Sequence, residues 1–342
     1  MTSSHPQLSG RIDTGVIDSA ALRGNPLGDP AERPVHVYLP PGYDESDERF
    51  PTVFVLQGYT GQVEMWFNRE PFVPTFPQAL DAVIASGECP PVIVVLVDAW
   101  NAYGGSQYVD SPATGRYHSY VVDDVVPWVD ARYRTIPDRE SRAVAGKSSG
   151  GFAAMITPML RPDVFGALAS HAGDSMYEYS YCAEFAKAFR ALKQFDGDIW
   201  AWWDKFRDRG GTTPTPDDWT LVMVLGCSAA FSADQDGTVQ LPFDTHSGRL
   251  RDDVWARWQA WDPVRMAPHH ADALRSLRAV WLDAGTRDEW FLDVGTQAFR
   301  AELHELGVPD DRVSLELFDA GHMDIGYRYP RAVTWLAHRL QR

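Results

Sequence analysis

The stretch Gly146-Lys147-Ser148-Ser149-Gly150-Gly151 determines how the rest of the chain is interpreted. It follows an apolar run at 142–145 that is typical of a buried strand, and it leads into a run at 149–160 with helical spacing. A tight turn from strand to helix needs small residues around Ser148. In this setting the pattern G-x-S-x-G predicts a serine nucleophile at a helix N-terminus, where free N–H groups and the helix dipole favour negative charge.

The same residues also end a different motif, the phosphate-binding loop G-x-x-x-x-G-K-[ST]. That motif requires glycine at position 141, where this chain has Ser141, and residues 142–145 indicate a strand rather than a glycine-rich loop. A nucleotide-binding loop is therefore disfavoured. Lys147 is either a solvated residue of the turn or a local positive charge near the serine, and the sequence leaves both interpretations open.

Apolar strands and helical segments alternate on both sides of this turn. Residues 52–56 and 92–97 are short, β-branched and bounded by proline or glycine, as in strands buried on both faces of a parallel sheet. The other predicted elements are strands at 34–39, 166–170, 277–282 and 313–318 and helices at 77–86, 118–133, 292–306 and from Pro330. This alternation predicts an α/β protein with a mostly parallel central sheet flanked by helices.

The alternation is interrupted between residues 175 and 262. This segment holds seven of the thirteen tryptophans and shows no strand–helix rhythm. We therefore expect a core formed by residues 1–174 and 263–342, and a mostly helical, tryptophan-rich cap formed by residues 175–262. The cap is either a packed accessory layer or a cover that shapes an acyl or aromatic pocket beside the serine.

A serine hydroxyl needs a base, and in this architecture an acid and then a histidine follow the serine along the chain. His322 comes directly after the last predicted strand, so its loop would return over the carboxyl edge of the sheet. His171 also follows a predicted strand, and we interpret it as a structural or pocket-lining residue. His322 is therefore the candidate base.

The candidate acid lies between the serine and the histidine. Asp288 is in the loop after the penultimate strand, where a carboxylate can orient an imidazole and stabilise its charged form. Asp174, which follows the strand after the serine helix, is the alternative acid, and Glu289 is the nearest substitute. Asp283 is expected to lie on the strand itself.

A tetrahedral intermediate also needs two N–H donors, one from the residue after the nucleophile and one from a loop after an earlier strand. The first donor would be the backbone of Ser149. The second would come from Gln57-Gly58-Tyr59-Thr60-Gly61, which ends the strand at 52–56, and we expect it to be the N–H of Tyr59.

Composition and charge exclude several classes of function. Asp and Glu outnumber Lys and Arg by 47 to 31, and the resulting net charge of −16 repels phosphate backbones and anionic lipid surfaces. We expect no nucleic-acid partner and no membrane partner. The three cysteines are widely spaced and suggest neither a disulfide framework nor a zinc site, and we expect no metal and no cofactor.

The N-terminal residues and the hydropathy of the chain are used to predict the cellular location of the protein. Residues 1–25 lack the apolar stretch of a signal peptide, and no window reaches the roughly 18 apolar residues of a membrane span. The expected location is cytoplasmic.

These motifs together resemble the α/β-hydrolase esterases that include esterase D (S-formylglutathione hydrolase), enterochelin esterase-like proteins and bacterial mycolyltransferases. The matching stretches, besides the serine turn, are Tyr38-Leu39-Pro40-Pro41-Gly42-Tyr43, Gln57-Gly58-Tyr59-Thr60-Gly61, Gly105-Ser106-Gln107-Tyr108, Phe165-Gly166-Ala167-Leu168-Ala169-Ser170, Gly285-Thr286-Arg287-Asp288 and Gly321-His322. The resemblance implies the α/β-hydrolase fold, and it gives Ser148, His322, Asp288, Tyr59 and Ser149 the same roles as the residue-by-residue argument.

The chain departs from the family pattern in three places. Gln57 stands where many members have histidine, and Lys147 stands where histidine, leucine or glutamate is more usual. The segment 175–262 is much longer than its counterpart in the compact esterase D type. The substrate class therefore does not transfer from the family.

The sequence as a whole predicts a metal-independent serine esterase that acts on a small-molecule ester through an acyl-enzyme on Ser148. One alternative is an acyltransferase that passes the acyl group from the same triad to an alcohol or sugar. The other is a non-catalytic binding protein on a hydrolase scaffold. The sequence does not determine the acyl and alcohol parts of the substrate or the oligomeric state. It is compatible with a homo-oligomer.

Overall fold

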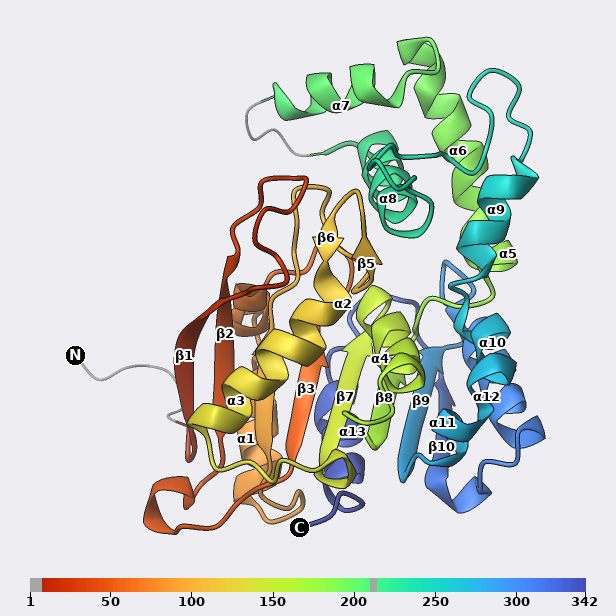
Figure 1. The fold of residues 1–342 in the computed structure, drawn as a ribbon. Helices are drawn as coiled ribbons and strands as arrows, with labels where there is room; N and C mark the ends of the chain where they lie inside the picture. The colour runs from red at the N-terminus through yellow and green to blue at the C-terminus, as the bar shows by residue number, and fades with distance from the viewer. Residues whose placement is uncertain (1–7, 210–213) are drawn as a thin grey trace.

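Eight strands form one sheet in the order β1-β2-β4-β3-β7-β8-β9-β10 in the computed structural model, which describes residues 8–209 and 214–342 (Figure 1). The strands are β1 (Arg11–Asp18), β2 (Glu32–Leu39), β3 (Thr52–Leu56), β4 (Ile93–Val97), β7 (Arg142–Lys147), β8 (Ala167–His171), β9 (Ala279–Gly285) and β10 (Val313–Phe318). Strands β3, β4, β7, β8, β9 and β10 run parallel to one another, and within this sheet only the pairings of β2 with β1 and β4 are antiparallel. The predicted mostly parallel sheet is confirmed. A small separate hairpin pairs β5 (Asp110–Ser111) with β6 (Gly115–Arg116).

Helices cover both faces of this sheet. One face packs against α1 (Phe76–Ala85) and α13 (Arg328–Ala337). The other face packs against α2 (Tyr117–Ser119), the π-helical segment η3 (Tyr120–Val125), α3 (Val126–Arg132), α4 (Ser149–Leu160), α10 (Pro263–Met266), α11 (Ala271–Arg275) and α12 (Leu292–Glu305). Short 3₁₀ helices are η1 (Tyr43–Glu45), η2 (Val63–Phe67), η4 (Arg139–Ser141), η5 (Lys193–Phe195), η6 (Ala267–His270) and η7 (Asp310–Arg312). Burial of aliphatic strand residues on both faces explains their unbroken apolar runs.

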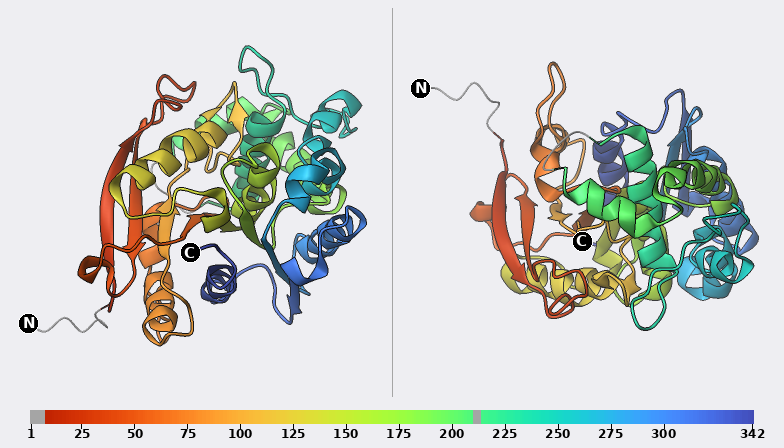
Figure 2. Two further views of the ribbon diagram at one scale, coloured as in Figure 1. Left: turned by 60° about the horizontal axis from the view of Figure 1, so that its bottom comes forward. Right: turned by 90° about the horizontal axis from the view of Figure 1, so that it is seen from above.

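The segment after β8 is helical. It contains α5 (Tyr177–Ser180), α6 (Cys182–Leu192), α7 (Ile199–Arg207), α8 (Pro216–Phe231) and α9 (Asp252–Gln259). The green helices α6, α7 and α8 lie over the carboxyl ends of the strands in both Figure 1 and the right-hand view of Figure 2. In the ranges that the structure describes, no helix has the length and apolarity needed to cross a membrane.

The cap tryptophans are mostly packing residues. Trp202 and Trp258 are fully buried, and the indole N–H of Trp258 donates to Ser232 Oγ at 2.9 Å. Only Trp200 and Trp219 have large exposed surfaces among the seven. The number of tryptophans therefore does not by itself indicate an aromatic substrate.

Most predicted boundaries agree with the structure, and two differences affect the argument. The strand predicted at 166–170 ends at His171, so His171 is the last residue of β8 rather than a residue that follows the strand. The edge strand β1 was not predicted. It pairs only with β2, most of its side chains are partly or fully exposed, and it therefore lacks the apolar run that marks the central strands.

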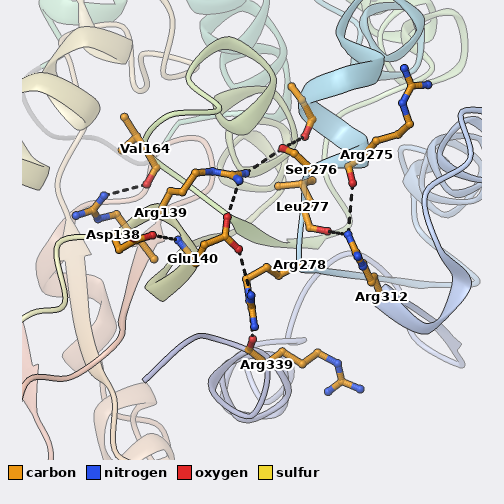
Figure 3. A network of polar contacts seen from close by, with 12 residues as sticks. Asp138, Arg139, Glu140, Val164, Arg275, Ser276, Leu277, Arg278, Arg312 and Arg339 are labelled. Carbon is orange, nitrogen blue, oxygen red and sulfur yellow. Dashed lines mark hydrogen bonds and ion pairs between the residues drawn. The ribbon is translucent and has the colours of Figure 1, made fainter.

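A network of polar contacts made by arginines lies at the end of the sheet opposite the cap (Figure 3). Arg139, which precedes β7, donates to Ser276 Oγ at 3.0 Å and to Glu140 at 2.6 Å. Arg278, which precedes β9, donates to the carbonyl oxygen of Arg339 at 3.1 Å. These contacts join the starts of two strands to the end of the chain, and they lie at the amino edge of the sheet, opposite the serine.

Candidate active site

Ser148 lies at the sharp turn between β7 and α4. Its backbone angles are φ 57° and ψ −124°, a region that residues other than glycine rarely adopt. Neighbouring glycines make the turn possible, because a Cβ on Gly146 would lie 2.3 Å from the Gly150 carbonyl carbon. A Cβ on Gly150 would lie 2.5 Å from the Leu56 carbonyl oxygen. The structure thus has the strand, turn and helix that the motif requires, with Ser148 half-buried at the helix N-terminus.

His322 and Asp288 form a hydrogen-bonded pair. The Nδ1 atom of His322 lies 2.8 Å from Asp288 Oδ2, and both side chains are buried. The second carboxylate oxygen of Asp288 accepts the backbone N–H of Trp290 at 2.9 Å. Glu289 instead accepts the backbone N–H of His322 at 2.8 Å. Asp288 is therefore held in the orientation that fixes the imidazole and leaves Nε2 as the nitrogen that can transfer a proton.

Asp174 contacts the candidate nucleophile itself. Its Oδ1 accepts a hydrogen bond from Ser148 Oγ at 3.3 Å, and its Oδ2 accepts one from the Tyr181 hydroxyl at 2.8 Å. Burial raises the pKa of Asp174, although Tyr181, His322 and Ser148 each favour its charged form. Within the described part of the chain, no hydrogen bond joins Ser148 Oγ to His322 in this conformation. Asp174, the alternative acid, is thus hydrogen-bonded to the serine, and Asp288 is hydrogen-bonded to the imidazole.

The loop after β3 approaches the serine closely. A Cβ on Gly58 would lie 3.5 Å from Ser148 Cβ, and a hydrogen bond from Gly61 N to Gly58 O at 3.0 Å closes the turn. Among the described residues, neither the N–H of Tyr59 nor that of Ser149 donates to a protein acceptor. Both donors are therefore free to bind an oxyanion.

The side chain of Tyr59 extends from this loop into the cap. Its hydroxyl lies 2.8 Å from the carbonyl oxygen of Val222 on α8 and also contacts the carbonyl oxygen of Tyr103. The helix comes close because Gly226 has no side chain, since a Cβ there would lie 2.3 Å from the Tyr59 hydroxyl. Gly105 leaves similar room on the ring, where a Cβ would lie 2.7 Å from Cδ2. No pattern in the sequence indicated this contact between the cap and the loop.

A second histidine–aspartate pair lies within the sheet next to the serine turn. His171 Nδ1 lies 2.7 Å from Asp283 Oδ1, and Arg328 Nε and Trp281 Nε1 each donate to Asp283 Oδ2 at 2.8 Å. The carbonyl oxygen of His171 accepts the N–H of Ser148 at 3.0 Å. Burial alone would raise the pKa of Asp283, but His171 and Arg328 outweigh that effect and lower it. His171 is fully buried and supports the turn from inside the sheet.

Lys147 is half-buried at the end of β7. Burial lowers its pKa, although the nearby carboxylates of Asp288 and Asp174 favour the charged form. The side chain is thus a partly buried cation near the candidate acids rather than a freely solvated residue of the turn.

Comparison with known proteins places this geometry in a family. A family model described as "Putative esterase" matches residues 30–307, which is most of the chain. The chain belongs to this esterase family. Over 140 residues, 38% of its length, the chain is 29% identical to an endo-1,4-beta-xylanase/feruloyl esterase of Xylanibacter ruminicola. The chain spans only 18% of that protein and no more than 28% of the next curated relatives.

Solved structures support the fold along almost the whole chain. A ferulic acid esterase is 19% identical with a TM-score of 0.61, and the alignment covers 98% of this chain and all of the other. An S-formylglutathione hydrolase from Agrobacterium tumefaciens is 15% identical with a TM-score of 0.55, and 99% of each chain is covered. The predicted resemblance to this group and the predicted α/β-hydrolase fold are confirmed.

Proposed function

We propose that this esterase hydrolyses small-molecule carboxylic esters through an acyl-enzyme on Ser148, with His322 as base and Asp288 as the acid that orients it. The observation that carries the proposal is the strained serine at the N-terminus of α4 together with an imidazole whose Nδ1 lies 2.8 Å from a buried carboxylate. A serine hydroxyl is a weak nucleophile until such a base accepts its proton. Membership of the esterase family supports ester hydrolysis as the overall reaction.

Acylation begins when the Ser148 hydroxyl turns from Asp174 toward His322 Nε2. The Oγ atom attacks the ester carbonyl carbon as its proton passes to His322, and the carbonyl oxygen becomes an oxyanion. The N–H groups of Tyr59 and Ser149 stabilise that charge. The intermediate then collapses, the carbon–oxygen bond to the alcohol breaks, and His322 returns its proton to the leaving alcohol.

Deacylation repeats these steps with water. His322 takes a proton from a water molecule, whose oxygen attacks the carbonyl carbon of the acyl-enzyme. Collapse of the second intermediate breaks the bond to Ser148 Oγ, and His322 returns the proton to the serine. Asp288 keeps the imidazole in the same tautomer and stabilises its charged form in both halves of the reaction.

The experiment that tests this function measures hydrolysis of p-nitrophenyl acetate and p-nitrophenyl butyrate by the wild type and by Ser148→Ala. We expect the variant to lose at least ~10³-fold in kcat. Ser86→Ala is the matched control, because Ser86 is exposed at the end of α1 and should keep the wild-type rate. EDTA should leave the rate unchanged, because His322 supplies the base. Full turnover by Ser148→Ala would rule out the proposed nucleophile.

A further inference from the structure

A buried carboxylate that the proposed mechanism does not use lies beside the nucleophile. Asp174 is only 8% exposed, and its two oxygens accept hydrogen bonds from Ser148 Oγ and from the Tyr181 hydroxyl. No lysine or arginine forms an ion pair with Asp174 in the ranges that the structure describes, although the half-buried Lys147 lies near it. The two groups that donate hydrogen bonds to this carboxylate are therefore neutral hydroxyls, and one of the two is the reacting group.

A chain of buried polar groups connects Asp174 to the cap. The Tyr181 hydroxyl lies 3.9 Å from Cys227 Sγ on α8, and Gln107 Nε2 donates to the same sulfur at 3.0 Å. The Gln107 Oε1 atom is buried and has no hydrogen-bond partner in the described part of the chain. One buried chain of polar groups therefore runs from Ser148 to Gln107. It contains the carboxylate of Asp174 and the unpartnered amide oxygen of Gln107. Both groups accept hydrogen bonds, so this chain is suited to a ligand that donates them.

Acylation changes the partners of Asp174. Once Ser148 Oγ carries the acyl group it has no proton, so Asp174 Oδ1 loses a donor and faces an ester oxygen instead. A buried charged acceptor without a donor is costly, and a substrate group that supplies the missing proton would be favoured in the transition state and in the acyl-enzyme. Burial raises the pKa of Asp174, as expected for a carboxylate that is removed from water.

The short distance between Asp174 and Ser148 limits the position of such a hydrogen-bond donor. Asp174 Oδ1 lies 3.3 Å from the atom that attacks the carbonyl, so it contacts only the part of the substrate next to the ester group. We therefore expect a hydroxyl on the α-carbon of the acyl part, or on the second carbon of the alcohol part, to come within the ~2.7 Å of an O–H···O hydrogen bond to this oxygen. We propose that Asp174 is a specificity residue that selects esters with a hydroxyl group close to the ester, on the α-carbon of the acyl part or on the second carbon of the alcohol part.

This inference rests on the proposed function, and its test uses two pairs of substrates in which a methyl group replaces the hydroxyl. Ethyl lactate is compared with ethyl isobutyrate for the acyl part, and 2-hydroxyethyl butyrate with propyl butyrate for the alcohol part. A pH-stat measures kcat/KM for the wild type, Asp174→Asn and Asp174→Leu. Because a hydroxyl also changes the intrinsic reactivity of an ester, the readout is the hydroxylated-to-methyl ratio in each variant relative to that in the wild type.

We expect the ratio for one pair to fall ~10- to 100-fold in Asp174→Leu, and by a smaller factor in Asp174→Asn, which keeps one acceptor oxygen. The pair that responds shows whether the hydroxyl belongs to the acyl or the alcohol part. Asp262→Asn is the matched control, because Asp262 is also a buried aspartate but accepts a backbone N–H from Tyr177 at 2.9 Å and does not contact Ser148.

Equal ratios in the wild type, Asp174→Asn and Asp174→Leu for both pairs would overturn the inference. A wild-type enzyme that hydrolyses p-nitrophenyl esters but none of the four test esters would also overturn it, while leaving the proposed function intact. Failure of the proposed function is a separate result, in which the wild type hydrolyses no ester at all. Asp174→Asn has nearly the shape of the native residue, and its melting curve shows whether a change in ratio occurs in a folded protein.

Discussion

The hydroxyl of Tyr59 lies 2.8 Å from the carbonyl oxygen of Val222, 163 residues further along the chain. This contact joins the loop after β3, which carries a candidate oxyanion donor, to helix α8 of the cap. Gly226 of this helix has no side chain, so the helix can approach the same hydroxyl closely. We therefore expect the position of the Tyr59 N–H to depend on the position of the cap.

Tyr59→Phe should lower kcat while changing KM little. The substitution keeps the ring but removes the hydroxyl that anchors the loop to α8, so the Tyr59 N–H is held less firmly where the oxyanion forms. We expect a decrease of about tenfold in kcat, smaller than the loss of an entire oxyanion donor. Steady-state kinetics with p-nitrophenyl butyrate measures the change.

Gly226→Ala perturbs the same contact from the cap, because its Cβ would lie 2.3 Å from the Tyr59 hydroxyl. It should reproduce the kcat effect of Tyr59→Phe. If both variants keep the wild-type kcat, the cap does not position the oxyanion loop, and the contact only packs the two segments together.

Asp288→Asn should lower kcat nearly as much as removal of the His322 imidazole. The carboxylate that now faces His322 Nδ1 at 2.8 Å would become an amide, which no longer holds the required tautomer or stabilises the charged imidazole. We expect kcat to fall by ~10³- to 10⁴-fold. The comparison is with Glu289→Gln, which alters the neighbouring carboxylate that accepts the backbone N–H of His322. A larger defect in Glu289→Gln than in Asp288→Asn would reverse the assignment of the acid.

Asp283→Asn should destabilise the fold and change its response to acid. The variant removes one charge from a buried group in which Asp283 binds His171 and Arg328, and such a loss costs about 3 to 5 kcal/mol. The pKa of Asp283 is lowered in the folded protein, so its stabilising effect is present above the unfolded value of about 3.9. That effect is lost as the pH falls below about 4 toward the folded pKa.

Urea unfolding at a series of pH values checks this prediction. The wild type should lose unfolding free energy as the pH falls below about 4, and Asp283→Asn should lose less over the same interval because it lacks the titrating group. Parallel curves for the two proteins would mean that Asp283 contributes no acid-dependent stability.

The local sequence was enough to predict the serine turn and the central strands. Glycines around Ser148 and unbroken β-branched runs such as 52–56 leave few alternatives, and residues 52–56, 149–160 and 313–318 form the elements that were predicted there. The order of serine, acid and histidine also gave Asp288 and His322, whose side chains meet at 2.8 Å. These features depend on short-range patterns or on the known order of elements in one sheet.

Contacts between distant segments could not be predicted in this way. The exposed edge strand β1 has no apolar run, so its pairing with β2 is not visible in the pattern. The bond from Ser148 to Asp174 and the contact of Tyr59 with α8 depend on how the loops and the cap pack in three dimensions. The pair of His171 with Asp283 arises because parallel strands β8 and β9 place these two residues side by side.

The central claim is that Ser148 is an activated nucleophile, and covalent labelling tests it most directly. The wild type and Ser148→Ala are treated with a fluorophosphonate, their intact masses are measured, and the modified peptide is mapped. The proposed mechanism predicts a single adduct on Ser148 in the wild type and none in the variant. An unlabelled wild type, or an adduct on another residue that persists in Ser148→Ala, would contradict the proposed mechanism.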